Sequence, residues 1–267
     1  MSEALAALLP WLGRELLAAG LVFLRVAGAV AVFPAFGEAA VPVRVRLALA
    51  LGLTMAVAPA VAGGAGEIAA AQVADLPPLA GGAVALVLTE TGIGLAFGLT
   101  VRLFVHALVT AGAMVAQATG LSQLFGAGGN EPSAAVAQLL HLAGLTLALS
   151  AGLHVQAAAA LIWTYDAFPL GRVPAAGPVA EWYLGALAAG FALAFRIAVP
   201  FLIAGLVWNL ALGAVNRAMP QLFATLAGAP ATMLGALALM LLLLPAGLGL
   251  WAEALAAFLA APDAAPP

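Results

Sequence analysis

Long apolar stretches, separated by short polar or glycine- and proline-rich segments, make up most of the chain. The stretches are rich in alanine and leucine and do not alternate between apolar and polar positions, so they predict helices and not strands. A helix that crosses a bilayer needs about 20 mostly apolar residues, and most of these stretches reach or exceed that length. We predict about six such helices, at residues 5–33, 44–60, 79–119, 134–165, 179–216 and 230–260.

Three of these helices carry a complication. The third is too long for one ordinary span and contains no proline, so it could be one long helix or two helices joined near Arg102. The fifth is interrupted by Arg196 and Pro200, and Pro245 predicts a kink in the sixth.

The segments between the helices differ in character. Residues 33–42 contain three punctuating glycine and proline residues and predict a turn. Residues 61–78 are glycine- and proline-rich and acidic, which predicts an exposed loop. Residues 120–133 break the apolar pattern with four glycines and a proline, and residues 166–178 form another proline- and glycine-rich loop.

The composition places the chain in a membrane. It has 267 residues, of which 66% are hydrophobic and only 7% are charged, whereas a soluble domain carries about 25% charged residues. Such a chain belongs in a bilayer or deep inside an assembly, and we expect an all-α integral membrane protein. The net charge of −3, with no lysine, leaves no basic patch suited to nucleic acid. There is no cysteine, and the N-terminus lacks the basic region of a cleaved signal peptide.

No catalytic or cofactor-binding pattern is present in the sequence. The three histidines are scattered and have no partner at metal-ligand spacing. The glycine-rich segment at residues 126–129 lacks the lysine of a phosphate-binding loop. We therefore expect neither an enzyme nor a cofactor or metal site.

Four of the charged residues are candidates for burial at membrane depth. An ionisable side chain at membrane depth costs about 2.5–3.5 kcal/mol on insertion scales, so each should face protein or water. Glu90 and Arg102 are twelve residues apart, about 18 Å along one helix, so their partners must lie elsewhere. Structural pairing is the favoured interpretation, and a proton relay is the alternative. The candidate buried charges are Arg25, Glu90, Arg102 and Arg196.

A stripe of small and polar residues runs along the fifth helix. Gly205, Asn209, Gly213 and Arg217 follow one another at intervals of four, which places them on one helical face. Glycines allow another helix to approach closely, and Asn and Arg then find hydrogen-bond partners there. Pro220 ends or kinks the helix just beyond. A packing face and a polar cluster at a membrane boundary both remain open.

The segment NLALGAVNRAMPQL at residues 209–222, followed by Gly228 and Pro230, resembles the signature of the FliR family. The N-R-x-x-P-Q core of that signature is matched by Asn216, Arg217, Pro220 and Gln221. A second segment, VPVRVRLALALGLTMAVAPA at residues 41–60, resembles the first basic loop and second apolar segment of the family. Members of this family are export-gate subunits of flagellar and related type III secretion systems.

The resemblance implies a fold and a set of partners. The whole chain, residues 1–267, would be one domain of tilted helical hairpins packed with partner subunits. Residues 1–133 would resemble FliP, and in residues 134–267 the last helices would resemble FliQ. The implied partners are FliP-like, FliQ-like and FlhB-like subunits and unfolded export substrates, in the bacterial inner membrane at the flagellar basal body. The implied subunit-packing residues are Gly205, Asn209, Gly213, Asn216, Arg217, Pro220 and Gln221.

The resemblance also assigns a role to the segment after the third helix. Glycines make this segment flexible, and leucine and phenylalanine side chains give it an apolar knob. These residues alone slightly favour an ordinary solvent loop. In the family, however, the corresponding loop projects into the central channel as a plug. The implied plug residues are Gln117, Gly120, Leu121, Leu124, Phe125, Gly126, Gly128 and Gly129.

The sequence thus predicts a subunit that completes and seals a protein export pore. A secondary transporter for a small solute is the leading alternative, with Glu90, Arg102, Asn209 and Arg217 lining a site at the membrane midplane. A non-conducting membrane scaffold is a third possibility. A transporter would function alone or as a homo-oligomer, whereas a gate subunit would depend on other proteins.

Overall fold

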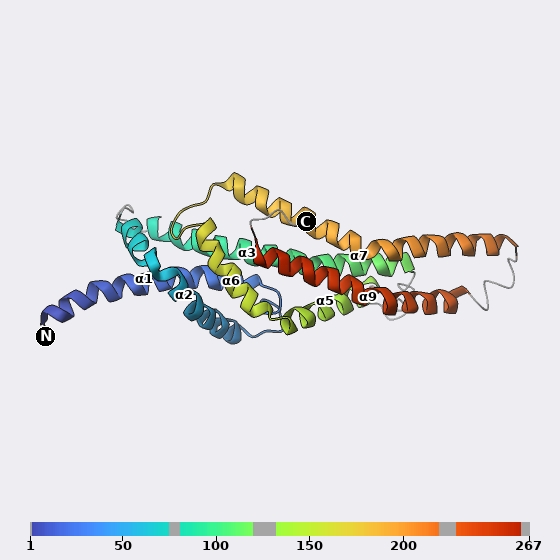
Figure 1. Ribbon diagram of the computed structural model, residues 1–267, viewed down its shortest axis with the longest axis horizontal. Coiled ribbons are helices and arrows are strands. Elements are labelled where there is room, and N and C mark those ends of the chain that lie inside the picture. Colours follow the sequence, from blue (N-terminus) through green and yellow to red (C-terminus); the bar gives the residue numbers. More distant parts are fainter. Residues whose placement is uncertain (1, 75–80, 120–131, 219–227, 263–267) are drawn as a thin grey trace. The chain divides into compact units, whose positions relative to one another are not determined.

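The computed structural model describes residues 2–74, 81–119, 132–218 and 228–262, and all regular secondary structure within these ranges is helical (Figure 1). Five of the described helices are long and apolar enough to cross a membrane, or six if a bent pair counts as one span. The prediction of an all-α membrane protein is confirmed. The helices are α1 (Ser2–Val32), α2 (Val43–Ala74), α3 (Gly81–Thr119), α5 (Pro132–Ser150), α6 (Leu153–Ala167), α7 (Ala176–Ala218) and α9 (Gly228–Ala260).

Helix α2 is longer than the sequence predicted. The loop expected at residues 61–78 is helical as far as Ala74, so that part of the prediction is wrong. Glycines in this stretch each cost a helix about 1 kcal/mol but do not end it. The residues that follow them, EIAAAQVA, are mostly strong helix formers, and no proline occurs after Pro59 until Pro77.

Helix α3 is a single helix, which decides between the two possibilities that the sequence left open. The next predicted helix is instead divided into α5 and α6. Gly152 lies at the break with φ of 81°, a left-handed conformation that glycine adopts without steric cost. A continuous apolar composition concealed this break, because Ser150, Ala151 and Gly152 do not interrupt the hydropathy.

Arg196 and Pro200 interrupt the apolar run but not the helix, since α7 is continuous from Ala176 to Ala218. Helix α9 likewise continues through Pro245. Proline is tolerated inside apolar helices of membrane proteins, because neighbouring groups can satisfy the backbone carbonyl that it leaves free. The description of α7 ends at Ala218, and Pro220 lies outside the described residues.

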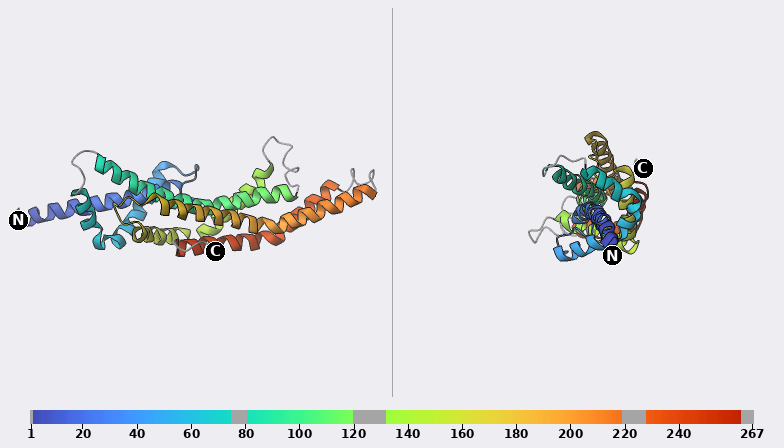
Figure 2. Two further views of the ribbon diagram at one scale, coloured as in Figure 1. Left: turned by 90° about the horizontal axis from the view of Figure 1, so that it is seen from above. Right: turned by 90° about the vertical axis from the view of Figure 1, so that its left-hand side faces the viewer.

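The helices form two compact units that interleave along the chain. Unit 1 contains residues 1–102, 152–186 and 257–266, so it includes α1, α2, α6 and the first part of α3. Unit 2 contains residues 103–151 and 187–256, which supply α5 and most of α7 and α9. Within unit 2, α9 and the later part of α7 lie side by side (Figures 1 and 2).

A seam of glycines holds α1 against α3 in unit 1. A Cβ atom placed on Gly28 would lie 2.6 Å from the carbonyl oxygen of Thr91, and one on Gly98 would lie 2.6 Å from that of Ala29. A Cβ on Gly94 would overlap the carbonyl oxygen of Arg25. Gly94 and Gly98 are four residues apart, the spacing that lets two membrane helices approach to backbone contact. Helix α2 packs against α1 and α6.

The core of unit 2 is built around Trp251 of α9, which is fully buried. Its indole Nε1 donates a hydrogen bond to the backbone carbonyl of Phe104 at 2.7 Å. Leu108 and the Trp251 ring face Gly144 of α5, so a side chain at Gly144 would meet both. A Cβ atom on Gly112 of α3 would lie 2.6 Å from Cα of Ala137 in α5. Small residues therefore set close helix spacing in this unit as well.

The glycine seam predicts a position-specific effect of added methyl groups. Gly94→Ala should lower the thermal midpoint of the detergent-solubilised protein, because overpacking typically costs about 1–3 kcal/mol. Gly92→Ala is the matched control, since a Cβ atom there meets nothing within 4 Å and the helix gains up to about 1 kcal/mol from alanine. Equal midpoints for the two variants would contradict the seam.

Candidate functional site

A buried ion pair joins α1 and α3 in unit 1. Nε of Arg25 lies 2.7 Å from Oε2 of Glu90, and both side chains have an exposed fraction of 0%. Removing two charges from water costs several kcal/mol per ion, so such a pair needs close geometry and additional hydrogen bonds to offset that cost. The partner of Glu90 is therefore Arg25 of α1. Arg102 lies on the same helix as Glu90 but is too far away to pair with it.

Further hydrogen bonds extend the pair to two more segments. Nη1 of Arg25 donates to the carbonyl oxygen of Thr164 at 3.0 Å, and its Cζ lies 4.0 Å from the centre of the Tyr165 ring, a cation–π contact. Oε1 of Glu90 accepts a hydrogen bond of 2.7 Å from the backbone N–H of Gly171. The pair therefore connects α1, α3, α6 and the α6–α7 connection.

Two polar atoms of this cluster have no hydrogen-bond partner among the described residues. They are Nη2 of Arg25 and the hydroxyl oxygen of Tyr165, and both are buried. Gly171 has φ of 75°, in the left-handed region where glycine is favoured. A larger residue at Gly171 would strain the turn that brings its N–H to Glu90.

Arg102 has a different role. Its Nη1 donates to the carbonyl oxygen of Val32 at 3.1 Å, at the C-terminal end of α1, where a cation also complements the helix dipole. Its Nη2 lies 3.4 Å from Oε1 of Glu38 in the turn that follows, with exposed fractions of 27% and 26% for the two side chains. Arg46 donates to the carbonyl oxygens of Glu38 and Val41, which fixes the same turn.

The structure places Arg196 on an exposed face of α7, so the chain by itself does not bury it, and its burial against partner subunits stays a prediction. Ile197 and Ala198 beside it are buried, whereas Phe195 is exposed. An apolar run shows that a helix is embedded but does not show which of its faces turns inward.

The predicted packing stripe is only partly used within the chain. Gly205 is buried, and a Cβ atom there would overlap the carbonyl oxygen of Ala118 in α3. Asn209 is exposed and donates to the carbonyl oxygen of Gly205 in its own helix at 2.8 Å. Gly213 and Arg217 are exposed. The side chain of Asn216, and Pro220 and Gln221 entirely, lie outside the described residues.

Most of the predicted plug also lies outside the described residues. Gln117 is the exception, and it is exposed near the end of α3. The remaining plug residues fall in 120–131, between the end of α3 and the start of α5. Their assignment therefore stays a prediction.

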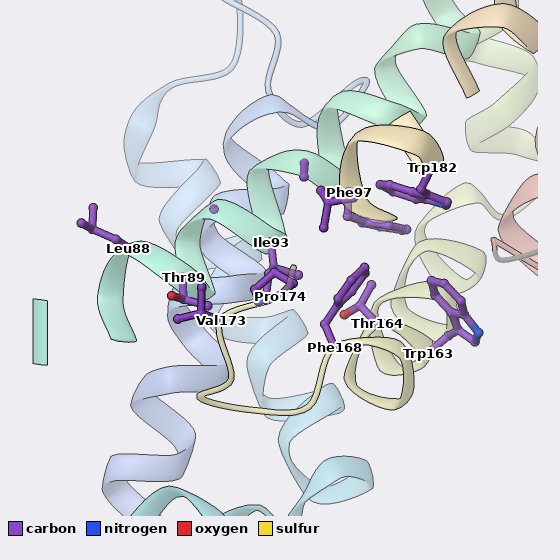
Figure 3. Close-up of a pocket in the computed structure, with 13 residues that line it drawn as sticks. Leu88, Thr89, Ile93, Phe97, Trp163, Thr164, Phe168, Val173, Pro174 and Trp182 are labelled. Atoms are coloured by element: carbon purple, nitrogen blue, oxygen red, sulfur yellow. The ribbon is translucent and has the colours of Figure 1, made fainter. Parts of the chain in front are cut away.

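An apolar pocket of about 300 Å³ lies beside the ion-pair cluster (Figure 3). Its walls come from α3, the end of α6, the α6–α7 connection and the start of α7, all of which belong to unit 1. Thr164 belongs both to the pocket wall and to the cluster, through its bond with Arg25. The lining residues are Leu88, Thr89, Gly92, Ile93, Ala96, Phe97, Trp163, Thr164, Phe168, Val173, Pro174, Val179 and Trp182.

Sequence reasoning missed several participants. Thr164, Tyr165 and Gly171 lie far from Arg25 along the chain, and nothing in a single sequence links them to it. The four-residue spacing of Gly94 and Gly98 was a usable signal for close helix approach. The described residues hold no cluster of three or more His, Asp or Glu side chains that could bind a metal ion.

The helices and their buried polar cluster define an integral membrane protein of several apolar spans. A sequence profile of the family described as "Bacterial export proteins, family 1" matches residues 16–258. The chain therefore belongs to family 1 of the bacterial export proteins.

Individual relatives agree with this assignment. The chain is 33% identical over 237 residues to the flagellar biosynthetic protein FliR of Caulobacter vibrioides, covering 88% of this chain and 91% of the relative. It is 31% identical over 160 residues to the protein of the same name from Aquifex aeolicus, covering 59% and 62%. It is 29% identical over 176 residues to that of Escherichia coli, covering 64% and 66%.

The buried ion pair predicts non-additive effects of mutation. Arg25→Met or Glu90→Leu alone should destabilise the protein by about 3–5 kcal/mol, because each leaves an uncompensated buried charge. The double variant should recover much of that loss, since no lone charge remains. Thermal unfolding in detergent measures the stability of the two single variants and of the double variant.

The partly exposed pair of Arg102 and Glu38 supplies the control for this experiment. Glu38→Gln should cost no more than about 1 kcal/mol, because water screens that pair. If the double variant loses as much stability as the two single variants together, Arg25 and Glu90 do not act as a unit.

Proposed function

We propose that the chain is a membrane subunit of the flagellar type III protein export gate, located in the bacterial inner membrane at the flagellar basal body. There it completes and helps to seal the pore through which unfolded export substrates cross. The observation that carries this proposal is the family match over residues 16–258, which covers most of the chain. The relatives that it resembles bear the name flagellar biosynthetic protein.

The side-chain geometry favours this role over the transporter alternative. A transport site needs a charged group that is free to bind its ion or solute. Both carboxylate oxygens of Glu90 are already engaged, one by Arg25 and the other by Gly171. The side-chain amide of Asn209 donates to its own helix. These contacts suit a structural role for the charges.

The exposed surface of unit 2 supports dependence on partner subunits. Asn209, Gly213 and Arg217 lie exposed on the same helix as a set of exposed apolar side chains. Polar groups on an embedded helix are stabilised when they face protein, and glycine permits close approach there. The partners would be FliP-like, FliQ-like and FlhB-like subunits, with the similarity of residues 1–133 to FliP and of the last helices to FliQ still a prediction. The exposed apolar side chains are Ile203, Leu206, Val207, Trp208, Leu210 and Val215.

The gate assignment is tested by removing the gene from its own bacterium. Secretion of flagellar export substrates into the medium should be lost and should return with the plasmid-borne chain. Affinity purification of the tagged chain should recover other small membrane proteins in fixed stoichiometry. A strain that secretes and swims normally without the chain would refute the assignment, and a chain that works alone in vesicles would favour the transporter.

Arg217 provides a test of the packing surface. Arg217→Ala should weaken the purified complex while the chain still inserts into membranes, because its partner group loses a hydrogen bond worth about 1–3 kcal/mol. Arg196→Ala on the same helix is the control that is matched for charge and exposure. Unchanged complex yield and secretion in Arg217→Ala would remove this residue from the interface.

The plug is tested by deleting residues 122–130. The assembly should remain intact but should leak small ions, because the apolar side chains that exclude water from the passage are gone. Leu124→Ser with Phe125→Ser should leak in the same way, and Gln123→Ala should not. Conductance is measured in vesicles that hold the complete assembly, and a deletion complex as tight as the wild type would exclude a plug here.

A further inference from the structure

The pocket in unit 1 is suited to a hydrocarbon ligand. None of its lining side chains carries a charge, and most are aliphatic or aromatic. Of the polar groups, the hydroxyl of Thr164 already donates to the carbonyl oxygen of Leu161 at 2.6 Å. The indole N–H of Trp182 donates to the carbonyl oxygen of Pro262 at 2.7 Å. These two groups need no partner from a ligand, so a polar molecule would lose hydrogen bonds on entering.

The size of the pocket matches a segment of a hydrocarbon chain. A cavity of about 150 Å³ lined by aliphatic and aromatic side chains holds a benzene molecule. By that scale, the volume of about 300 Å³ has room for on the order of twelve carbon atoms. This is too large to stay empty without losing many dispersion contacts along its walls.

The mouth and the floor of the pocket differ in exposure. Leu88 and Val173 line the pocket and are 67% and 74% exposed, so they mark its mouth. Ile93, Phe97 and Thr164 are buried and form its floor (Figure 3). Both α3 and α7 contain a span apolar enough to cross a membrane. The mouth is therefore continuous with helix surfaces that are suited to hydrocarbon.

Charged groups of both signs lie on the elements that form the pocket, which suits a zwitterionic phospholipid headgroup. Arg172 precedes Val173 and is exposed, and neither ion pair found among the described residues involves it. Asp166 and Glu181 are also exposed on the neighbouring elements, and their carboxylates would repel a phosphate but attract the ammonium group of a zwitterionic headgroup. A guanidinium beside an apolar opening can bind the phosphate of a lipid whose chain enters the pocket. Trp163 and Trp182 belong to a residue type that is enriched where hydrocarbon meets the headgroups.

We propose that this pocket binds one acyl chain of a membrane phospholipid. The acyl chain would lie against Ile93 and Phe97, with the headgroup outside the mouth near Arg172. The wall formed by the α6–α7 connection is held by the bond from Gly171 to Glu90, so the buried ion pair also maintains the shape of the pocket. This inference does not depend on the role of the protein in export.

Two natural tryptophans in the pocket wall allow a direct test. The complex isolated from membranes is reconstituted in phosphatidylcholine vesicles whose acyl chains carry bromine at mid-chain, which quenches tryptophan on contact. Unbrominated vesicles give the reference, and a Trp163→Phe/Trp182→Phe chain gives the background. We expect a loss of fluorescence that is absent from the background chain.

Filling the pocket distinguishes an inserted chain from lipid on the outer surface. Gly92 lines the pocket, and a Cβ atom on it meets nothing within 4 Å, so Gly92→Leu should occupy the space and abolish the quenching. Gly52→Leu on α2, also an exposed helical glycine with nothing within 4 Å, should leave the quenching unchanged. If Gly92→Leu does not assemble, Val173→Asp at the mouth replaces it, since a carboxylate there opposes entry of hydrocarbon.

The remaining outcomes overturn the proposal. Equal quenching in Gly92→Leu and the parent chain would mean that lipid touches these tryptophans only from outside. Absence of quenching from the two tryptophans in the parent complex would mean that no acyl chain enters. If brominated lipid quenches the isolated protein but not the complex, a side chain of a partner subunit fills the pocket.

Discussion

The ion pair between Arg25 and Glu90 is the constraint on which unit 1 depends. Both side chains are fully buried, so neither can fall back on water, and each must be neutralised by the other and by neighbouring backbone groups. The carbonyl oxygen of Thr164 and the N–H of Gly171 supply those groups. One pair of charges therefore determines where α1, α3, α6 and the α6–α7 connection meet, because any displacement would leave a buried charge unsatisfied.

Close helix approach makes this geometry possible. In hydrocarbon, helices gain nothing by hiding apolar side chains from lipid, so association relies on packing contacts and hydrogen bonds. The glycines along α3 bring its backbone against α1, next to the carbonyl of Arg25 itself. The ion pair and the glycine seam therefore support each other. The seam fixes the spacing between the helices, and the pair fixes their register.

The two units meet the demands of a membrane differently. Unit 1 buries the ion pair of Arg25 and Glu90 in its interior and contains an apolar pocket. Unit 2 has a core closed by Trp251 but leaves Gly213 and Arg217 of the α7 stripe exposed. The proposed role in a larger assembly requires both a stable interior and a surface that partner subunits can contact.

The sequence by itself determined the all-helical membrane class, most helix positions and the family resemblance, because length and hydropathy are local properties and the N-R-x-x-P-Q motif is contiguous. Tertiary structure alone decided the break at Gly152, the exposure of Arg196 and the pairing of Arg25 with Glu90. Each of these depends on which face of a helix turns inward and on residues distant along the chain. The pocket is likewise a property of four segments together, and no single segment encodes it.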